Sequence, residues 1–260
     1  MVPSEYNPVR RHEQHHQNAK EETRLIYVLS DPHGLYDKYR TMLNTIQLKS
    51  TDTLYVLGDV IDRGPDGLAI LQDMMGRPNV IPILGNHEFT AAICIPWLLK
   101  EVTDQSLNAL GNVQIAALSD WINNGGGPTL RALKQLPQDE REDILDYIKE
   151  MELYAEVEAG GHSYVLVHAG LDHFSPGKPL SEYELQDFLF CRNSMNTTYY
   201  ADKFLIFGHT PTSLLRQQAG EPPTDRILRW GTQIAIDCGC AFGGPLGAIC
   251  LDTQEEFYVK

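Results

Sequence analysis

The chain has 260 residues, of which 42% are apolar and 22% are charged. This composition is typical of a soluble globular protein, and the length suits one hydrophobic core. The formal net charge is −14, which argues against a nucleic-acid-binding protein, because such binding depends on neutralising phosphates with Lys and Arg. Any phosphate chemistry must therefore depend on a local positive site, which a metal cluster can supply.

The first 23 residues, "MVPSEYNPVRRHEQHHQNAKEET", are polar throughout. They hold no apolar run that could serve as a secretory signal, and no run elsewhere is long enough to span a membrane. Five cysteines are too few and too irregularly spaced for a disulfide scaffold. We therefore expect a cytoplasmic, monomeric protein without membrane or nucleic-acid partners, in which a flexible arm (1–23) precedes a single domain (24–260).

The first half of that domain alternates strands with helices. "RLIYVLS" (24–30), "TLYVLG" (53–58) and "VIPIL" (80–84) are apolar runs of strand length. Between them, "LYDKYRTMLNTI" and "DGLAILQDMM" have the apolar spacing of amphipathic helices. A β-α-β-α-β order predicts an α/β fold with parallel strands and right-handed crossovers.

The second half begins with a mostly helical segment, about 89–160, which we expect to cover the substrate. "PQDEREDILDYIKEMELY" (137–154) predicts one long amphipathic helix there. Strands are predicted at 163–169 and 203–208, and "SEYELQDFLF" (181–190) predicts a helix that ends just before Arg192. The last three apolar runs, beginning at 233, 246 and 256, predict a closing antiparallel meander.

Five short polar clusters share one placement. "SDPHG" (30–34), "GDVIDRG" (58–64), "GNHE" (85–88), "HAG" (168–170) and "GHTP" (208–211) each follow an apolar strand directly. In an open α/β sheet, the crevice beyond the carboxyl ends of the strands is where ligands bind. The clusters therefore predict one site, to which they bring the following polar residues: Asp31, His33, Asp59, Asp62, Asn86, His87, His168 and His209.

These residue types indicate two divalent metal ions. Carboxylate, imidazole and amide oxygen are ligands for manganese, iron or zinc, and one carboxylate can bridge two ions about 3.5–4 Å apart. A water shared by the two ions becomes hydroxide near neutral pH and can attack phosphorus in line. The clusters contain no Cys or Ser positioned as a nucleophile, so we expect direct hydrolysis without a phosphoenzyme.

The series "SDPHG…GDVIDRG…GNHE…HAG…GHT" resembles the PPP family of metal-dependent serine/threonine protein phosphatases, particularly its compact bacterial and phage members. The resemblance spans about 25–250 and implies the calcineurin-like metallophosphoesterase fold, a central mixed β-sandwich flanked by helices, with a helical cap segment. It implies two divalent ions as cofactors, manganese first and iron or zinc as alternatives. It also implies a phosphoprotein or phosphopeptide as substrate, hydrolysed at phosphoserine or phosphothreonine, with phosphotyrosine as a further candidate.

The same resemblance gives each site residue a role. Asp31 and His33 would bind the first metal ion, and Asp59 would bridge the two ions. The second ion would be bound by Asn86, His168 and His209. His87 would be the general acid, oriented by Asp62, while the substrate phosphate would be held by Arg63, Arg192 and Asn86.

Three other functions fit part of the pattern. A nuclease or cyclic-nucleotide phosphodiesterase of the wider group usually carries Gly-His-x-His, where this chain has Pro211. A symmetrical diadenosine tetraphosphate hydrolase shares the same metal motifs, and Trp97 or Trp121 of the helical segment could stack on its base. A non-catalytic scaffold would be expected to lack a ligand or the acid, which this chain retains. The dinucleotide hydrolase is the principal alternative.

Overall fold

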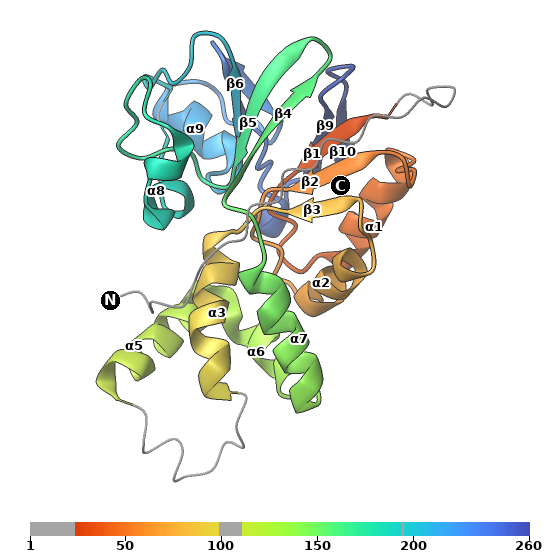
Figure 1. Cartoon of the computed structure of the whole chain (residues 1–260), viewed down its shortest axis with the longest axis vertical. Helices are drawn as coiled ribbons and strands as arrows, with labels where there is room; N and C mark the ends of the chain where they lie inside the picture. Colours follow the sequence, from red (N-terminus) through yellow and green to blue (C-terminus); the bar gives the residue numbers. More distant parts are fainter. Residues whose placement is uncertain (1–23, 99–110, 194) are drawn as a thin grey trace.

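The computed structural model describes residues 24–98, 111–193 and 195–260. The predicted N-terminal arm lies outside these residues. Two five-stranded sheets form the upper part of the view in Figure 1, with α1 (Tyr36–Thr45) and α2 (Gly67–Met75) beside the first and α8 (Leu185–Leu189) and α9 (Thr212–Gln218) beside the second. A separate group of helices lies below both sheets (Figure 1).

The first sheet has the strand order β10-β9-β1-β2-β3. Its predicted strands are β1 (Ile26–Leu29), β2 (Thr53–Val56) and β3 (Val80–Pro82), which pair in parallel as expected from the β-α-β-α-β order. The antiparallel strands β9 (Leu246–Cys250) and β10 (Glu256–Val259) extend the sheet beyond β1. All three parallel strands therefore end at the same edge.

The second sheet has the order β4-β5-β6-β8-β7. It is built from β4 (Tyr154–Ala159), β5 (His162–Val167), β6 (Phe204–Phe207), β7 (Leu228–Trp230) and β8 (Gln233–Ala235). The three central strands, β5, β6 and β8, are parallel, and the outer two pair antiparallel to them. The fold is thus the predicted mixed β-sandwich with flanking helices.

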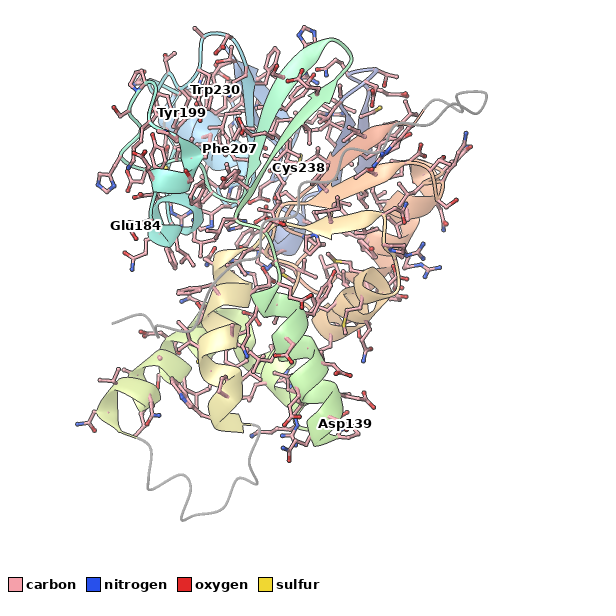
Figure 2. The ribbon with its side chains drawn as sticks, in the orientation of Figure 1. Asp139, Glu184, Tyr199, Phe207, Trp230 and Cys238 are labelled. Atoms are coloured by element: carbon pink, nitrogen blue, oxygen red, sulfur yellow. The ribbon has the colours of Figure 1, made fainter. Side chains whose placement is uncertain are left out.

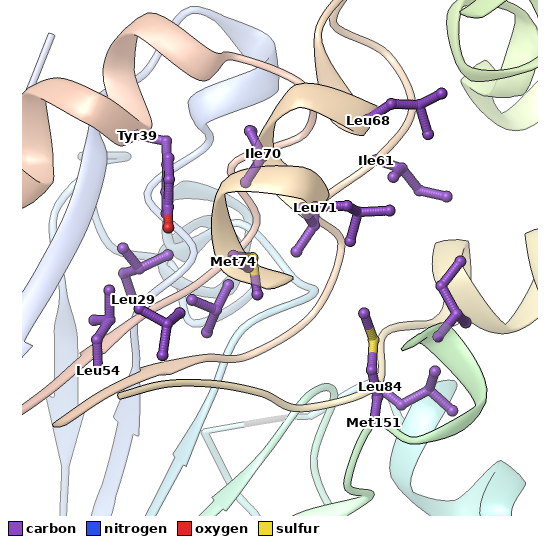
Figure 3. Close-up of a cluster of buried hydrophobic side chains, with 14 of the residues drawn as sticks. Leu29, Tyr39, Leu54, Ile61, Leu68, Ile70, Leu71, Met74, Leu84 and Met151 are labelled. Atoms are coloured by element: carbon purple, nitrogen blue, oxygen red, sulfur yellow. The ribbon is translucent and has the colours of Figure 1, made fainter. Parts of the chain in front are cut away.

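Side chains alternate between the two faces of each sheet. On β1, Val28 joins the core between the sheets, where it meets Leu166 and Ile206. Its neighbour Leu29 instead faces the helices and packs with Tyr39 in the cluster of Figure 3. The second sheet repeats this pattern, since its outer face carries a separate cluster that includes Phe207 and Trp230 (Figure 2). This period of two is what a strand buried on both faces requires.

The helical segment contains α3 (Asn86–Leu98), α5 (Asn112–Trp121), η1 (Ile122–Gly126), α6 (Gly127–Leu133) and α7 (Gln138–Lys149). It packs against the helix-facing core of the first sheet through Ile144, Ile148 and Trp121. The described part of the predicted segment is helical up to Lys149, and strand β4 (154–159) occupies its end. None of the helices in the described ranges is long and apolar enough to cross a lipid bilayer.

Three local predictions were wrong. The helix predicted over 137–154 ends at Lys149, and the chain enters the unpredicted strand β4, which pairs with β5 over six positions. The strand β7 was not predicted at all. The predicted closing meander does not form, because β8 belongs to the second sheet and runs parallel to β6, while β9 and β10 complete the first sheet. The strands β4 and β7 form hairpins with the strands that follow them directly, β5 and β8, whereas β8 and β9 are placed by pairing with β6 and β1, which are distant in sequence.

Candidate active site

The ten predicted site residues come together where the parallel strands of both sheets end (Asp31, His33, Asp59, Asp62, Arg63, Asn86, His87, Arg192, His168 and His209). Nine non-glycine residues in the described chain have positive φ, and six of them belong to this set. A left-handed non-glycine residue costs about 1–2 kcal/mol. The backbone of the sharp turns after the strands is therefore held in a conformation that these residues do not prefer, and contacts elsewhere in the fold must offset the cost.

Three potential ligand atoms surround the Nε2 atom of His168, which is itself a fourth. Its other ring nitrogen, Nδ1, donates to the backbone oxygen of Leu57 at 2.7 Å, so Nε2 carries a lone pair. That nitrogen lies 2.9 Å from Oδ1 of Asn86, 3.1 Å from Nδ1 of His209 and 3.4 Å from Oδ1 of Asp59. Burial lowers the pKa of both histidines, so neither imidazole supplies a charge. Such a group of electron-pair donors fits a divalent cation.

A second group lies on the other side of Asp59. Nε2 of His33 is 3.5 Å from Oδ2 of Asp59, and Nδ1 of His33 donates to the backbone oxygen of Ile61 at 3.1 Å. Burial lowers the pKa of His33 to about 3, so this imidazole is also neutral. Nη1 of Arg63 donates to Nε2 of His33 at 2.6 Å. The guanidinium of Arg63 thus faces the lone pair on Nε2 of His33, the atom that is predicted to bind metal.

Buried carboxylates give the site an excess of negative charge. Asp31 accepts hydrogen bonds from Ser30 and from the backbone N–H of His209, and burial together with the neighbouring Asp237 and Asp59 raises its pKa well above the usual range. Burial raises the pKa of Asp237 to about 7, with a further contribution from Asp59. Because the imidazoles are neutral, bound divalent ions would supply the missing positive charge. The residues present therefore fit a two-metal site.

The predicted acid and its orienting carboxylate are in direct contact. Nδ1 of His87 donates to Oδ2 of Asp62 at 2.7 Å, and both side chains are buried. Burial alone would lower the pKa of His87, but the carboxylates of Asp59 and Asp62 outweigh it and raise the pKa. Nη2 of Arg63 lies 3.2 Å from Nε2 of His87. The two carboxylates thus favour the protonated form that a general acid needs.

The arginines lie on different sides of the site. Arg63 contacts His33 and His87, whereas Arg192 lowers the pKa of His168 and His209 by its charge and donates to Thr210 at 3.3 Å. Arg192 follows α8, as predicted from sequence. The residue after Arg192, Asn193, is buried. It donates to the backbone oxygen of Ala169, beside His168, and accepts from Tyr199.

Sequence reasoning missed several residues that support the site. Glu88 of "GNHE" was quoted without a role, yet its buried carboxylate accepts from the backbone N–H groups of Asp59, Val60 and Ile61 at 2.8–3.0 Å. Burial raises its pKa to about 7. Asp237 belongs to none of the five polar clusters found in the sequence. No sequence signal linked Trp121 or Thr129 to Asp62, although both donate to its carboxylate.

The burial of three side chains near the site limits what they can do. Trp121 is fully buried, so it is not available to stack on a substrate base. Cys238 and Cys240, on either side of Gly239, are buried free thiols whose pKa values are raised by burial. Since the thiolate is the reactive form, their surroundings favour packing over redox chemistry.

The chain belongs to the calcineurin-like phosphoesterase family, whose model matches residues 24–213. It is 27% identical over 91% of both chains to a symmetrical bis(5'-nucleosyl)-tetraphosphatase of Coxiella burnetii (strain RSA 331). A protein of the same name from Acidovorax sp. (strain JS42) is 28% identical, but the match spans 56% of this chain and only 44% of that relative. A crystal structure assigned as a diadenosine tetraphosphatase superposes with a TM-score of 0.62 over 92% of this chain and 94% of its own, at 16% identity.

The chain is therefore a hydrolase-type metallophosphoesterase, with residues suited to bind a divalent metal pair. The fold expected from the sequence is confirmed. The protein phosphatase specificity expected from the PPP resemblance stays a prediction. The identity of the metal stays a prediction as well.

Proposed function

We propose that this protein hydrolyses dinucleoside polyphosphates, with a symmetrical dinucleoside tetraphosphate as the preferred substrate. The proposal replaces a protein phosphatase as the leading function, because relatives named for the dinucleotide reaction match nearly the whole chain. The site is compatible with either substrate. What must distinguish them is a contact for the nucleoside.

An exposed aromatic ring beside Arg63 is the observation that carries this proposal. Phe242 ends the short helix η3 (Cys240–Phe242) with 69% of its surface exposed, although phenylalanine is usually buried. Its ring centroid lies 5.0 Å from Cζ of Arg63. Nucleobases stack on such rings with about 1–3 kcal/mol per base. A phosphate chain held by Arg63 could therefore present its base to Phe242.

The reaction follows from the placement of the side chains. Arg63 and Arg192 would bind phosphate oxygens on the two sides of Asp59, and Arg63 would exchange its contact with His87 for one to phosphate. Two divalent ions bound at the site would activate water for direct attack on phosphorus and neutralise phosphate charge. His87, protonated at Nε2, gives that proton to the departing oxygen as the P–O bond breaks. The products would be two nucleoside diphosphates.

The test compares substrates side by side on the manganese-loaded protein. Diadenosine tetraphosphate, a phosphoserine peptide and p-nitrophenyl phosphate are assayed for kcat/KM. We expect preference for the dinucleotide, and we expect F242A to lower kcat/KM for that substrate about 5- to 160-fold, as loss of one stacked base predicts. The same variant should leave p-nitrophenyl phosphate hydrolysis nearly unchanged.

Two variants serve as controls. F242W keeps an aromatic surface and should retain dinucleotide hydrolysis, while L214A removes an exposed apolar side chain on α9 and should have no effect. Two results together would contradict the proposal: a preference for the phosphoserine peptide, and an F242A variant that keeps its activity on both the peptide and the dinucleotide. They would restore the protein phosphatase as the leading function.

A further inference from the structure

A segment of the helical region, residues 121–129, contacts the loop 58–64 at three points. We call this loop, which carries Asp59, Asp62 and Arg63, the catalytic loop. Nε1 of Trp121 donates to Oδ2 of Asp62 at 2.8 Å. Oγ1 of Thr129 donates to Oδ1 of Asp62 at 2.6 Å and accepts from the backbone N–H of Asp62 at 3.0 Å. The backbone oxygen of Gly125 accepts from the N–H of Arg63 at 2.9 Å. The 121–129 segment thus contacts both Asp62 and Arg63, which lie in the same loop as Asp59.

Two glycines make this approach sterically feasible. Gly125 has φ of +104°, and a Cβ at this position would lie 2.8 Å from Cγ of Arg63. A Cβ at Gly126 would lie 2.6 Å from the indole of Trp121. Any larger residue would therefore displace either the catalytic loop or the tryptophan. Two glycines of the "GGG" run are thus required by close packing, Gly125 against Arg63 and Gly126 against Trp121.

The carboxylate of Asp62 is fixed by donors in different directions. Oδ2 accepts from both the indole of Trp121 and the imidazole of His87, while Oδ1 accepts from Thr129. All four side chains are buried. Asp62 also has φ of +70°, and the hydrogen bond from its backbone N–H to Thr129 helps to hold this left-handed conformation. Removing either donor would let the carboxylate rotate away from His87.

We propose that Trp121 and Thr129 are positioning residues for proton donation: they hold Asp62 so that His87 points its acidic proton at the leaving oxygen. The helical segment then contributes to the chemical step as well as covering the site. In that step, the O–H bond on the leaving group forms as its bond to phosphorus breaks, and neutral His87 regains a proton from water. This inference depends on His87 as the acid and is independent of whether the substrate is a dinucleotide.

The variants are chosen to separate positioning from folding. W121F removes the indole donor and keeps an aromatic side chain in the core, and T129V removes the hydroxyl at nearly constant volume. T129S retains the hydroxyl and should therefore keep the kcat that T129V loses. W97F is the matched control, because it removes an indole from the same helical segment, where Trp97 packs against the same core.

The assay uses two aryl phosphates with manganese-loaded protein: phenyl phosphate, whose leaving group needs a proton, and p-nitrophenyl phosphate, whose leaving group does not. We expect W121F and T129V to lose about tenfold or more in kcat on the first and less than about threefold on the second, since general acids act on poor leaving groups. T129S and W97F should match the wild type. Bound metal should be unchanged in every variant.

A double-mutant cycle with H87N gives the decisive comparison. If Trp121 acts through His87, W121F should cost nothing further once the acid is absent. The cycle is run on phenyl phosphate and on the substrate that the side-by-side assay favours. Equal losses on both aryl phosphates, a loss of bound metal, or an undiminished effect of W121F in the H87N protein would each overturn the proposal, because each would mark a structural role.

Discussion

Glu88 is expected to stabilise the catalytic loop strongly, although it is neither a predicted metal ligand nor an acid. Its two carboxylate oxygens accept three backbone N–H groups, those of residues 59–61, at 2.8–3.0 Å. In E88A these buried donors lose their acceptor. An unsatisfied buried donor costs about 1–3 kcal/mol, so even the lowest value gives about 3 kcal/mol for the three together.

Thermal unfolding measures this effect. For a chain of this size, about 3 kcal/mol lowers Tm by about 6–12 °C. E158A, which truncates an exposed glutamate on β4, is the matched control and should shift Tm little. We also expect E88A to bind manganese weakly, because the displaced loop carries Asp59. A Tm within about 2 °C of the wild type would refute the reasoning, since it would mean that three buried N–H groups find other partners without cost.

Three further predictions concern the metal bridge, the acid and a surface ion pair. D59N should lose both metal ions by elemental analysis, and retention of two ions would rule out the bridge. H87N should keep its metal but lose about 100-fold or more in kcat on phenyl phosphate; an unchanged rate would remove its role as acid. Asp73 accepts from Arg77 at 2.6 Å, and although partial burial opposes the shift, this contact lowers the pKa of Asp73 below 3.8. A carboxyl with a lowered folded pKa adds stability above its unfolded pKa and loses it as pH falls, so the stability difference between wild type and D73N should be present at pH 7 and disappear at acid pH; a difference independent of pH would contradict this.

Most of the candidate site could be predicted because its residues follow the strands directly. A strand is recognisable from a short apolar run, and parallel pairing brings the residues after each run to one edge of the sheet. Asp31, Asp59 and His168 are all found by this rule. Its success does not require knowing which strands are neighbours, since any order of parallel strands gives the same edge.

The residues that escaped prediction depend on contacts between distant segments. Trp121 and Thr129 lie 59 and 67 positions from Asp62, and the helical pattern of their own segment explains them equally well as core. The same limitation applies to β8, whose run has no local feature that selects β6 as its partner, so the meander predicted from the order of the last three runs was wrong. The strand β4 differs, because only Gly160 and Gly161 separate it from β5, with which it pairs as a hairpin.

The net negative charge of the chain predicts how kcat/KM depends on salt. The chain is formally −14, and two divalent ions remove only part of this charge, so a polyphosphate substrate approaches against repulsion. Attraction comes from the bound ions and from Arg63 and Arg192 at short range. The screening length falls from about 30 Å at 0.01 M salt to about 8 Å at 0.15 M, so added salt weakens the distant repulsion more than contacts inside the site. We therefore expect kcat/KM for the dinucleotide to rise over this range, with sodium chloride as the salt. A steep fall would instead show that exposed cations attract the substrate, as in proteins that bind nucleic acid.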